Sequence, residues 1–326
     1  MKKLSIFLIP VISIFMIIGC GVNKAVTIDE VKEINFVVPD GLPAISIAKM
    51  IKEKPEFQKR YNVNYNIEKV PDNVATSIMK SEADIAIVPS NIPAISYNKN
   101  GDYKIAGTVG WGSFYIVSTD NSQSIDDLKG KEIYNIGKGL TPDIITKAIL
   151  KNNNIDPDKD VNLSYVGGVT EIAPVILSGK ANYAVLPEPA LSTVLSKKDN
   201  LNILLDLNEE WKKENDSKYG YPQATIIIKK DLIENNNKLV EKILREIENS
   251  TIWAYKDKEA LGDYCEEIGV SANKNIIVSA MERANIKYVD IKDSVSEYNT
   301  YFKKLYEFDN ITVGGNIPDE GIYMEK

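Results

Sequence analysis

The sequence predicts an α/β fold made of two similar lobes that are joined by two hinge crossovers. Short apolar strands alternate with helical segments, which is typical of a parallel α/β sheet. The same pattern occurs twice, and residues of the second copy follow those of the first at a constant offset of 98 positions. Two further strand-like segments, one after each copy, have the positions expected of crossovers between lobes.

The first copy begins with a strand, a turn and a helix in residues 33–51. Residues 34–38 are apolar except for one asparagine, as expected for a strand covered on both faces. Residues 39–41, Pro-Asp-Gly, interrupt the strand, and apolar residues then recur at helical spacing. The rest of the copy is predicted as a strand at 63–70, a short helix at 74–79 and a strand at 84–89.

The second copy restarts at residues 131–150 with a strand, a glycine-rich turn and a helix. Its last strand has the same shape as the last strand of the first copy, because Ala83, Ala86 and Pro89 match Ala181, Ala184 and Pro187. The residue after the final proline differs, being Ser90 in one copy and Glu188 in the other. We interpret the copies as two lobes; the alternative is two ordinary βαβ runs in one sheet.

The expected crossovers lie at residues 103–121 and 219–232, where glycine or proline adjoins aromatic residues. The C-terminal region is predicted to be helical at 237–257, 258–268, 273–285 and 293–308. The chain is therefore expected to leave the first lobe, build the second and return. We predict lobe I at residues 33–110 plus 222–326, and lobe II at 111–221.

Residues 1–19 have the features of a secretory signal. Two lysines precede an apolar run that is too short and interrupted for a membrane span. The run ends in "IIGC", which resembles the lipobox of bacterial lipoproteins. That resemblance implies a lipid on Cys20, a linker at 20–32 and an extracytoplasmic protein anchored to the cell membrane. The alternative is an ordinary signal peptide with an incidental cysteine.

The composition excludes several classes of function. The chain has no histidine, which rules out Ser-His-Asp and Cys-His nucleophile systems and histidine metal sites. Without residues 1–19, 37 Lys and Arg stand against 46 Asp and Glu, a net charge of −9. Nucleic acid is not expected as a partner of so acidic a chain. With Cys20 lipidated, Cys265 has no disulfide partner, and we expect neither a metal nor a cofactor.

Two carboxylates follow strand ends, where ligands of open α/β sheets bind. Glu188 comes directly after "YAVLP", and Asp40 holds the comparable place after the first strand. Together they suggest a ligand that carries an amine or another donor group. For Glu188, contact with a ligand and a structural role, as a helix cap or in an ion pair between lobes, have equal weight. For Asp40 a turn role is favoured, since Asp-Gly is a common turn pair.

The stretch "GKGLTPDI" (137–144) suggests an anion site. Gly137 and Gly139 permit close backbone approach, and Thr141 is a predicted N-cap before a proline. Free amides at a helix start attract sulfonate, phosphate or carboxylate groups. Asp143 complicates this, because it places a negative charge in the first turn. Gly41 and Leu42 form a weaker candidate for an anion site at the equivalent turn of the first copy. Thr170 follows another glycine-rich turn, where its hydroxyl could donate a hydrogen bond.

Further candidates are small polar groups in the first copy and aromatic residues in the crossovers. Ser90 and Asn91 follow the third strand, while Trp111 and Tyr221 lie in the first and second crossover. The aromatic rings could stack on a planar ligand, since small-molecule sites are mostly apolar with a few placed polar groups. The alternative for each ring is a place in the core between lobes.

Four segments in this order resemble the solute-binding proteins of bacterial ABC importers: "PDGLPAISIAKMI", "ADIAIVPSN", "DDLKGKEIYNIGKG" and "ILSGKANYAVLPEPALS". Within that class the chain is similar to the aliphatic-sulfonate, taurine, nitrate and thiamine-pyrimidine type. The resemblance covers about residues 34–230. It implies a type II periplasmic binding protein-like fold, in which two lobes close on one small solute and then dock on a membrane permease that works with an ATPase.

We therefore expect a monomeric, non-enzymatic receptor for a small organic solute that is either sulfonate-like or taurine-like, or resembles the pyrimidine of thiamine. Bare nitrate fits poorly, because Glu188 would repel it. Two alternatives remain open. One is an enzyme on the same fold, like the pyrimidine-synthase relatives of this type, which the lack of histidine disfavours. The other is a sensory or adhesive lipoprotein without a role in transport.

Overall fold

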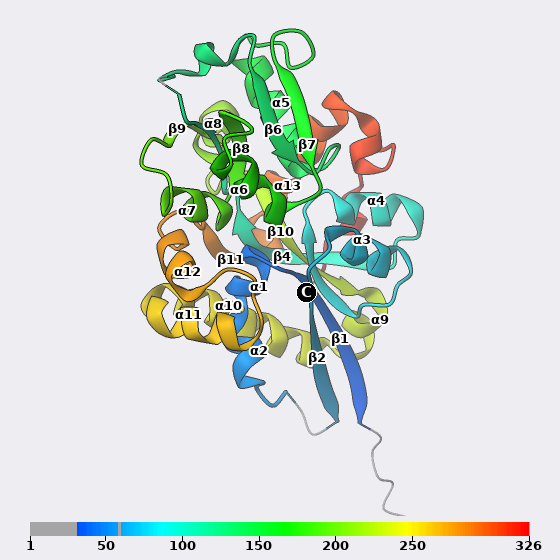
Figure 1. Ribbon diagram of the computed structural model, residues 1–326. Coiled ribbons are helices and arrows are strands. Elements are labelled where there is room, and N and C mark those ends of the chain that lie inside the picture. The colour runs from blue at the N-terminus through cyan, green and yellow to red at the C-terminus, as the bar shows by residue number, and fades with distance from the viewer. Residues whose placement is uncertain (1–30, 58–59, 121, 326) are drawn as a thin grey trace, which may run out of the picture. The chain divides into compact units, whose positions relative to one another are not determined.

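The structure is a computed structural model that describes residues 31–57, 60–120 and 122–325. It is a mixed α/β fold with two separate sheets, as predicted (Figure 1). The predicted signal peptide, Cys20 and most of the linker lie outside the described residues. Among the described residues, no helix is long and apolar enough to span a membrane.

The first sheet has six strands in the order β11-β4-β10-β3-β1-β2. Strand β1 is parallel to both β2 and β3, whereas β10 is antiparallel to β3 and β4, and β11 is antiparallel to β4. The central strands are buried on both faces, in agreement with their apolar sequences. The strands are β1 (Lys32–Pro39), β2 (Tyr61–Glu68), β3 (Ile85–Pro89), β4 (Tyr103–Trp111), β10 (Pro222–Lys229) and β11 (Ile286–Asp290).

The second sheet has five strands in the order β7-β6-β8-β5-β9. Here β6 is parallel to β7 and β8, and β5 is antiparallel to β8 and β9. We call the first sheet with the helices packed on it lobe I, and the second sheet with its helices lobe II. The strands are β5 (Phe114–Ser118), β6 (Glu132–Ile136), β7 (Asn162–Val166), β8 (Tyr183–Pro187) and β9 (Asn202–Asp206).

Helices cover both sheets (Figure 1). Those between the strands of the first sheet are α1 (Leu42–Ser46), α2 (Ala48–Glu53), α3 (Pro71–Met79) and α4 (Ile92–Lys99). Those between the strands of the second sheet, or directly after them, are α5 (Thr141–Asn152), α6 (Val169–Leu177), α7 (Ala190–Leu195) and α8 (Leu207–Asn215). The C-terminal helices are α9 (Lys230–Asn235), α10 (Asn237–Lys256), α11 (Lys258–Glu267), α12 (Lys274–Ala280) and α13 (Val295–Phe308).

The predicted repeat is confirmed in the element boundaries. Helix α6 begins and ends 98 positions after α3, and strand β8 begins and ends 98 positions after β3. The strand orders β2-β1-β3 and β7-β6-β8 are also equivalent, and an antiparallel strand follows each. Two similar α/β units therefore stand where the sequence placed its two copies. The residue limits proposed for the two lobes stay a prediction.

The chain passes between the sheets at two short connections. Gly112 and Ser113 join β4 of the first sheet to β5 of the second, and residues 216–221 join α8 to β10. The two strands after these connections, β5 and β10, each take the place next to the last parallel strand of the sheet they enter. Each connection is thus a crossover, as the sequence indicated.

Three elements differ from the expectations. Strand β9 and helix α8 occupy a stretch that had no assigned structure, and the expected helix at 273–285 ends at Ala280, before strand β11. Strands β9 and β11 are short edge strands, so partners distant in sequence, β5 and β4, determine their conformation. Helix α8 has a local cause, because the Asp206 carboxylate accepts hydrogen bonds from the amides of Asn208 and Glu209 at its start.

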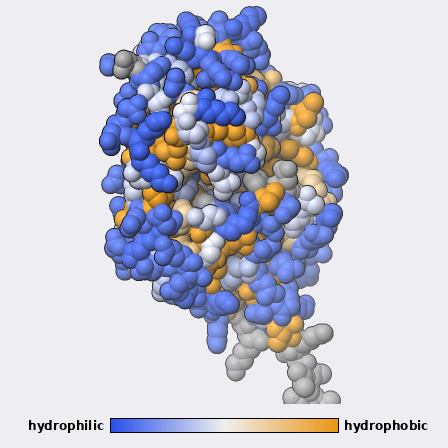
Figure 2. All heavy atoms as spheres, in the orientation of Figure 1, coloured by the Kyte–Doolittle hydropathy of each residue, from blue (hydrophilic) through white to orange (hydrophobic). Residues whose placement is uncertain are grey.

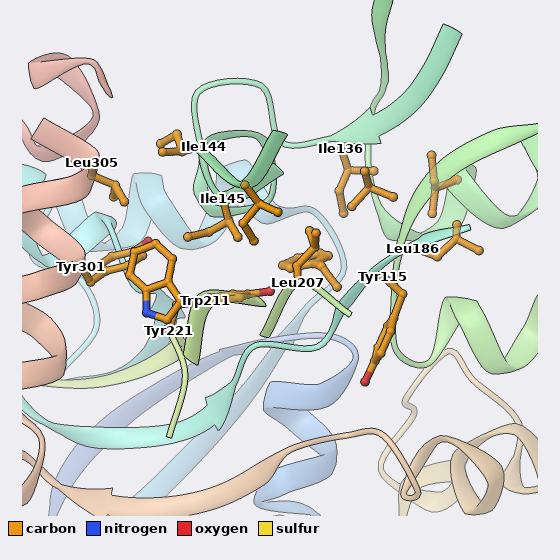
Figure 3. Close-up of a cluster of buried hydrophobic side chains, with 14 of the residues drawn as sticks. Tyr115, Ile136, Ile144, Ile145, Leu186, Leu207, Trp211, Tyr221, Tyr301 and Leu305 are labelled. Carbon is orange, nitrogen blue, oxygen red and sulfur yellow. The ribbon is translucent and has the colours of Figure 1, made fainter. Parts of the chain in front are cut away.

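A hydrophobic core connects the two lobes. Figure 3 shows Trp211, Tyr221 and Tyr301 side by side, with isoleucines of α5 above them. The ring of Trp211 packs edge-on against Tyr221, with centroids 5.9 Å apart, and lies 6.3 Å from the ring of Tyr301. Because these rings come from α8, the second crossover and α13, the C-terminal helix α13 is packed against lobe II as well as lobe I.

Candidate functional site

A cavity of about 210 Å³ lies between the lobes, at the carboxyl ends of strands β1, β3, β6 and β8. Ligands of open α/β sheets bind at this edge. Figure 2 shows hydrophobic residues near the middle of one face of the molecule, framed by a mostly hydrophilic surface. We call this cavity the inner chamber. Its apolar side chains are Pro39, Leu42, Pro43, Val88, Pro89, Trp111, Phe114, Ile136, Leu140, Pro142, Val169, Pro187 and Ala224.

Seven of the predicted site residues line the inner chamber, and five do not. Those that line it are Asp40, Gly41, Leu42, Trp111, Gly137, Thr141 and Glu188. Those that do not are Ser90, Asn91, Gly139, Thr170 and Tyr221. Lining the cavity does not by itself make a residue a ligand contact, so the bonds of each polar group decide what it can offer.

Glu188 is buried and held by protein groups from both lobes. Its Oε1 accepts hydrogen bonds from Arg283 Nε at 2.7 Å and from the Ser192 hydroxyl at 3.0 Å, and its Oε2 accepts one from the Ser192 amide at 3.1 Å. Ser192 lies in α7 of lobe II, whereas Arg283 precedes β11 of lobe I. Burial raises the pKa of Glu188, although the bonds from Arg283 and Ser192 act in the opposite direction. Glu188 therefore forms the ion pair between lobes, and it bonds an amide in the first turn of α7, whose N-cap is Pro189.

Asp40 organises the turn after β1. Its Oδ1 accepts hydrogen bonds from the amides of Gly41 at 2.9 Å and Ser271 at 3.2 Å, and its Oδ2 lies 3.1 Å from Lys69 Nζ. Burial opposes ionisation of this carboxyl, but the bonds from Ser271 and Lys69 outweigh it and lower the pKa of Asp40. The charge that Asp40 shows to the chamber is thus already balanced by Lys69, in line with the favoured turn role.

The predicted anion site at the start of α5 is largely occupied by the protein itself. Asp143 Oδ2 accepts a hydrogen bond from the Gly139 amide at 2.8 Å and lies 3.0 Å from Lys147 Nζ, while its Oδ1 accepts one from the Tyr165 hydroxyl at 2.6 Å. An external anion would have to compete with this carboxylate for the Gly139 amide. Asp143 therefore occupies the Gly139 amide in the turn before α5, and its negative charge there is the complication that the sequence suggested.

Thr141 is not the N-cap that the sequence predicted. Helix α5 is capped by Leu140, and Thr141 is its first residue. The Thr141 hydroxyl lies 2.7 Å from that of Tyr301 on α13 and is within hydrogen-bonding distance of it. Tyr301 thus takes a hydroxyl that a ligand could otherwise use.

The two predicted aromatic residues have different places. Trp111 lines the chamber, packs against the ring of Tyr219 with centroids 4.8 Å apart, and donates from Nε1 to the Lys287 carbonyl at 3.2 Å. Tyr221 is fully buried in the aromatic cluster of Figure 3 and does not reach the chamber, which is the core alternative. The second aromatic side chain of the chamber is Phe114, which the sequence analysis did not single out.

Ser90 and Asn91 are fully buried and do not line the chamber. The Ser90 hydroxyl accepts a hydrogen bond from Thr225 at 2.7 Å, and the Thr225 hydroxyl lies 2.6 Å from that of Tyr298. Asn91 donates from Nδ2 to the Thr312 carbonyl at 3.3 Å. Both side chains fasten the C-terminal region to the end of β3, because neutral polar groups without water need such partners.

The two crossovers are bonded to each other beside the chamber. Gln223 Oε1 accepts a hydrogen bond from the Ser113 amide at 2.8 Å, and its Nε2 donates to the Ser113 hydroxyl at 2.9 Å. Asn208 of α8 fills the space next to Gly112 and Gly220, and a Cβ at either glycine would overlap its side chain. The sequence placed Gln223 in the second crossover but did not show its pairing with Ser113, which lies 110 positions earlier in the chain.

A second cavity, of about 450 Å³, adjoins the inner chamber, and we call it the outer chamber. The glycine-rich turn before α6 borders both cavities, and Thr170 lines only the outer one. In the described part of the chain, no cluster of His, Cys, Asp and Glu side chains could hold a metal ion. The only described cysteine, Cys265, is buried, and burial raises the pKa of its thiol to about 12.

Comparisons with known proteins agree with this geometry. Residues 61–260 match the family described as NMT1/THI5 like. YtlA of Bacillus subtilis, whose name describes it as a binding protein, is 26% identical over 187 residues. That match covers 56% of this chain and 54% of YtlA, so the chain spans about half the length of the curated relative it matches.

Solved structures with the same fold include solute-binding proteins of ABC transporters. An ABC transporter protein from Parabacteroides distasonis is 27% identical, with a TM-score of 0.78 over 90% of this chain and 99% of that chain. The periplasmic aliphatic sulphonate binding protein SsuA from Escherichia coli superposes with a TM-score of 0.74 over 90% of this chain and 92% of SsuA. At 12% identity SsuA supports the fold alone.

Proposed function

This chain belongs to the NMT1/THI5-like family, and on that premise we propose that it is the solute-binding protein of an ABC importer. It captures one small organic solute between its lobes and delivers it to a membrane permease. The observation that carries the proposal is the inner chamber, which both lobes line at the carboxyl ends of their parallel strands. The absence of histidine from the chain fits a receptor better than an enzyme.

The walls of the inner chamber favour an uncharged planar solute over a sulfonate. Trp111, Phe114 and five prolines make most of the surface apolar, as in many small-molecule sites. The carboxylates of Asp40 and Glu188 already have cationic partners. At the predicted anion site before α5, the Gly139 amide is already bonded to Asp143 and is not free for a sulfonate. A heterocycle of pyrimidine type, the second of the two solute classes expected from the sequence, therefore fits better.

The contacts proposed for this solute are the predicted residues that line the chamber, together with Phe114. Trp111 and Phe114 would stack on the ring, since aromatic pairs prefer offset or tilted faces. The turns at Gly41 and Gly137 would approach it through their backbone, and Leu42 would cover its edge. Glu188 would act mainly by holding the lobes together, through Arg283.

The place of the protein in the cell follows the same proposal. A lipid on Cys20 would anchor a monomeric chain to the outer side of the cell membrane, next to its permease and ATPase. A single acyl chain binds membranes only marginally, whereas multiple chains anchor stably. Mass spectrometry of the mature N-terminus would test this directly, because an unmodified Cys20 in the secreted chain would contradict it.

Isothermal titration of the purified chain tests the solute class. The heterocycles are 4-amino-5-hydroxymethyl-2-methylpyrimidine, adenine and lumichrome, and the anions are taurine, ethanesulfonate and nitrate. We expect at least one heterocycle to bind more tightly than every anion. Trp111→Ala should weaken that binding by about 1–3 kcal/mol, as for a buried aromatic anchor.

Trp253→Ala is the matched control. Trp253 stacks on Tyr264 with centroids 5.0 Å apart, away from the chamber, so its loss should leave the affinity unchanged. Tighter binding of an anion would contradict the solute class. Equal losses in the two variants would show that Trp111 acts through stability rather than through contact.

A further inference from the structure

The outer chamber continues the inner one between the two lobes. The two cavities share six lining residues, three from the turn after β1 and three from the turn after β7: Pro39, Asp40, Gly41, Gly167, Gly168 and Val169. The outer chamber is open to solvent and is bordered by α6 and α7 on the lobe II side, and by residues 68–70 and 271–272 on the lobe I side. Both chambers are thus parts of one inter-lobe space.

Glycines border the passage between the chambers on both sides. Gly41 belongs to lobe I and Gly168 to lobe II, and a Cβ built on either would meet no atom within 4 Å. Gly41 has a φ of 95°, which favours glycine. Gly168 has a φ of 173° and a ψ of −174°, an extended conformation that any residue can adopt. The open space at Gly168 is therefore not required by its backbone.

The chemistry of the two chambers differs. The polar side chains of the inner chamber are bonded within the protein: Asp40 to Lys69, Glu188 to Arg283, Gln223 to Ser113 and Thr141 to Tyr301. In the outer chamber, the Thr170 hydroxyl and the Lys197 ammonium form no hydrogen bond or ion pair with the described residues. The outer chamber thus offers two exposed polar groups that no described residue bonds. They lie in the same lining as the carboxylates of Glu68 and Glu171, which bond Asn73 and the Gly167 amide.

We propose that the solute has two parts: a planar, apolar head in the inner chamber and a polar tail that passes between Gly41 and Gly168 into the outer chamber. Hydroxyl or anionic groups on the tail bind Thr170 and Lys197, while stacking holds the head. This inference rests on the proposed function and extends it, because a compact heterocycle alone would leave the larger chamber empty.

The test compares three pairs of probes on the full-length chain, each pair being a bare ring and the same ring with a polar tail. The pairs are 4-amino-5-hydroxymethyl-2-methylpyrimidine with thiamine, adenine with adenosine, and lumichrome with riboflavin. In at least one pair, we expect the tailed probe to bind about tenfold more tightly than its bare ring, which is the effect of one good hydrogen bond to a charged or hydroxyl group.

Gly168→Phe places a large side chain in the shared space without backbone strain. We expect it to remove the advantage of the tailed probe. Because Gly168 also lines the inner chamber, the bare ring is titrated on the same variant, and the ratio of the two affinities is the measure. The bare ring is the internal control, because a misfolded variant would bind neither probe. Thr170→Val with Lys197→Met, which remove the hydroxyl and the charge with little change in side-chain size, should reduce the advantage without affecting the bare ring.

The outcomes separate the inference from the proposed function. If no probe binds the wild-type chain, both fail. If bare rings bind but tails add nothing, or if Gly168→Phe leaves the advantage of the tail intact, the two-part solute is overturned and the receptor stands. A tail advantage that Gly168→Phe abolishes and the Thr170 and Lys197 changes reduce supports the inference.

Discussion

Strands β3 and β8 have the same position in the two sheets, but the residues that follow them have opposite surroundings. After Pro89, Ser90 turns into a buried hydroxyl cluster with Thr225 of the same lobe. After Pro187, Glu188 reaches Arg283 of the other lobe and still borders the inner chamber. One strand end is thus fastened within its lobe, whereas its counterpart bonds across the cleft. A shared backbone position therefore does not imply a shared role.

The different partners explain why a carboxylate follows strand β8 and a hydroxyl follows strand β3. A buried carboxylate is tolerated only if it is paired and hydrogen-bonded. Glu188 satisfies this through an arginine that belongs to the opposite lobe, so its pairing depends on the lobes being together. Ser90 needs only neutral partners, which its own lobe supplies. We infer that Glu188 contributes to closure and Ser90 to the stability of lobe I.

Arg283→Ala should have the largest effect, because it leaves the Glu188 carboxylate buried without its cation. Breaking a buried ion pair in this way costs about 3–5 kcal/mol of unfolding free energy. Urea unfolding at pH 8 and pH 5 measures this loss of unfolding free energy. The loss should be smaller at pH 5, because protonation of Glu188 removes the buried charge. The exposed Arg245→Ala is the control and should change stability by no more than about 0.5 kcal/mol. Equal losses of unfolding free energy for Arg283→Ala and Arg245→Ala would contradict the role of Arg283 as the partner of a buried charge.

Ser90→Ala should have a smaller effect. It removes one neutral hydrogen bond from the cluster, and Thr225 can still bond Tyr298, so the loss in unfolding free energy should be about 1 kcal/mol. Solute affinity should not change, because Ser90 does not line the chamber. A clear loss of affinity with unchanged stability would make Ser90 a ligand contact, as the sequence first suggested.

The smallest expected effects are in how Asp40 and Glu188 make the unfolding free energy depend on pH. The pKa of Asp40 is lowered in the folded state, so its contribution is present above the unfolded pKa and is lost as the pH falls. The pKa of Glu188 is raised, so its contribution is present at low pH and is lost as the pH rises through the folded pKa. Relative to wild type, Asp40→Asn should therefore lose more stability at pH 7 than at pH 3.5.

Glu188→Gln should show the opposite trend and lose more stability at the lower pH. Chemical denaturation across this range measures both variants under the same conditions. Parallel profiles for the two substitutions would mean that the burial of Glu188 does not outweigh its pairing with Arg283.

The sequence predicted the architecture well because its signals were local and repeated. The offset of 98 positions was visible in small residues and prolines, and it reappears in the limits of α3 and α6. Strand β11 could not be predicted in this way, because it is only five residues long and lies outside both copies of the repeat.

The site was predicted less completely, because the sequence places a side chain but does not supply its partner. Glu188 was found as a charge at a strand end, whereas Arg283, 95 positions later, was not. Its only signal was rarity, as it is one of three arginines in the chain. Asp143 was visible as a conflict within the anion site, and the conflict was real.

Small-angle X-ray scattering with and without solute tests the central claim, that the lobes close on a small molecule. The solute is whichever heterocycle or tailed probe binds in the titrations, and the chain is first stripped of any bound molecule by unfolding and refolding. We predict that the wild-type chain has a smaller radius of gyration with solute than without it, as expected for hinge closure. The Arg283→Ala variant lacks the ion pair between the lobes, so at a subsaturating solute concentration its radius of gyration should stay at the value without solute. Saturating binding that leaves the radius of gyration of the wild-type chain unchanged would contradict the claim.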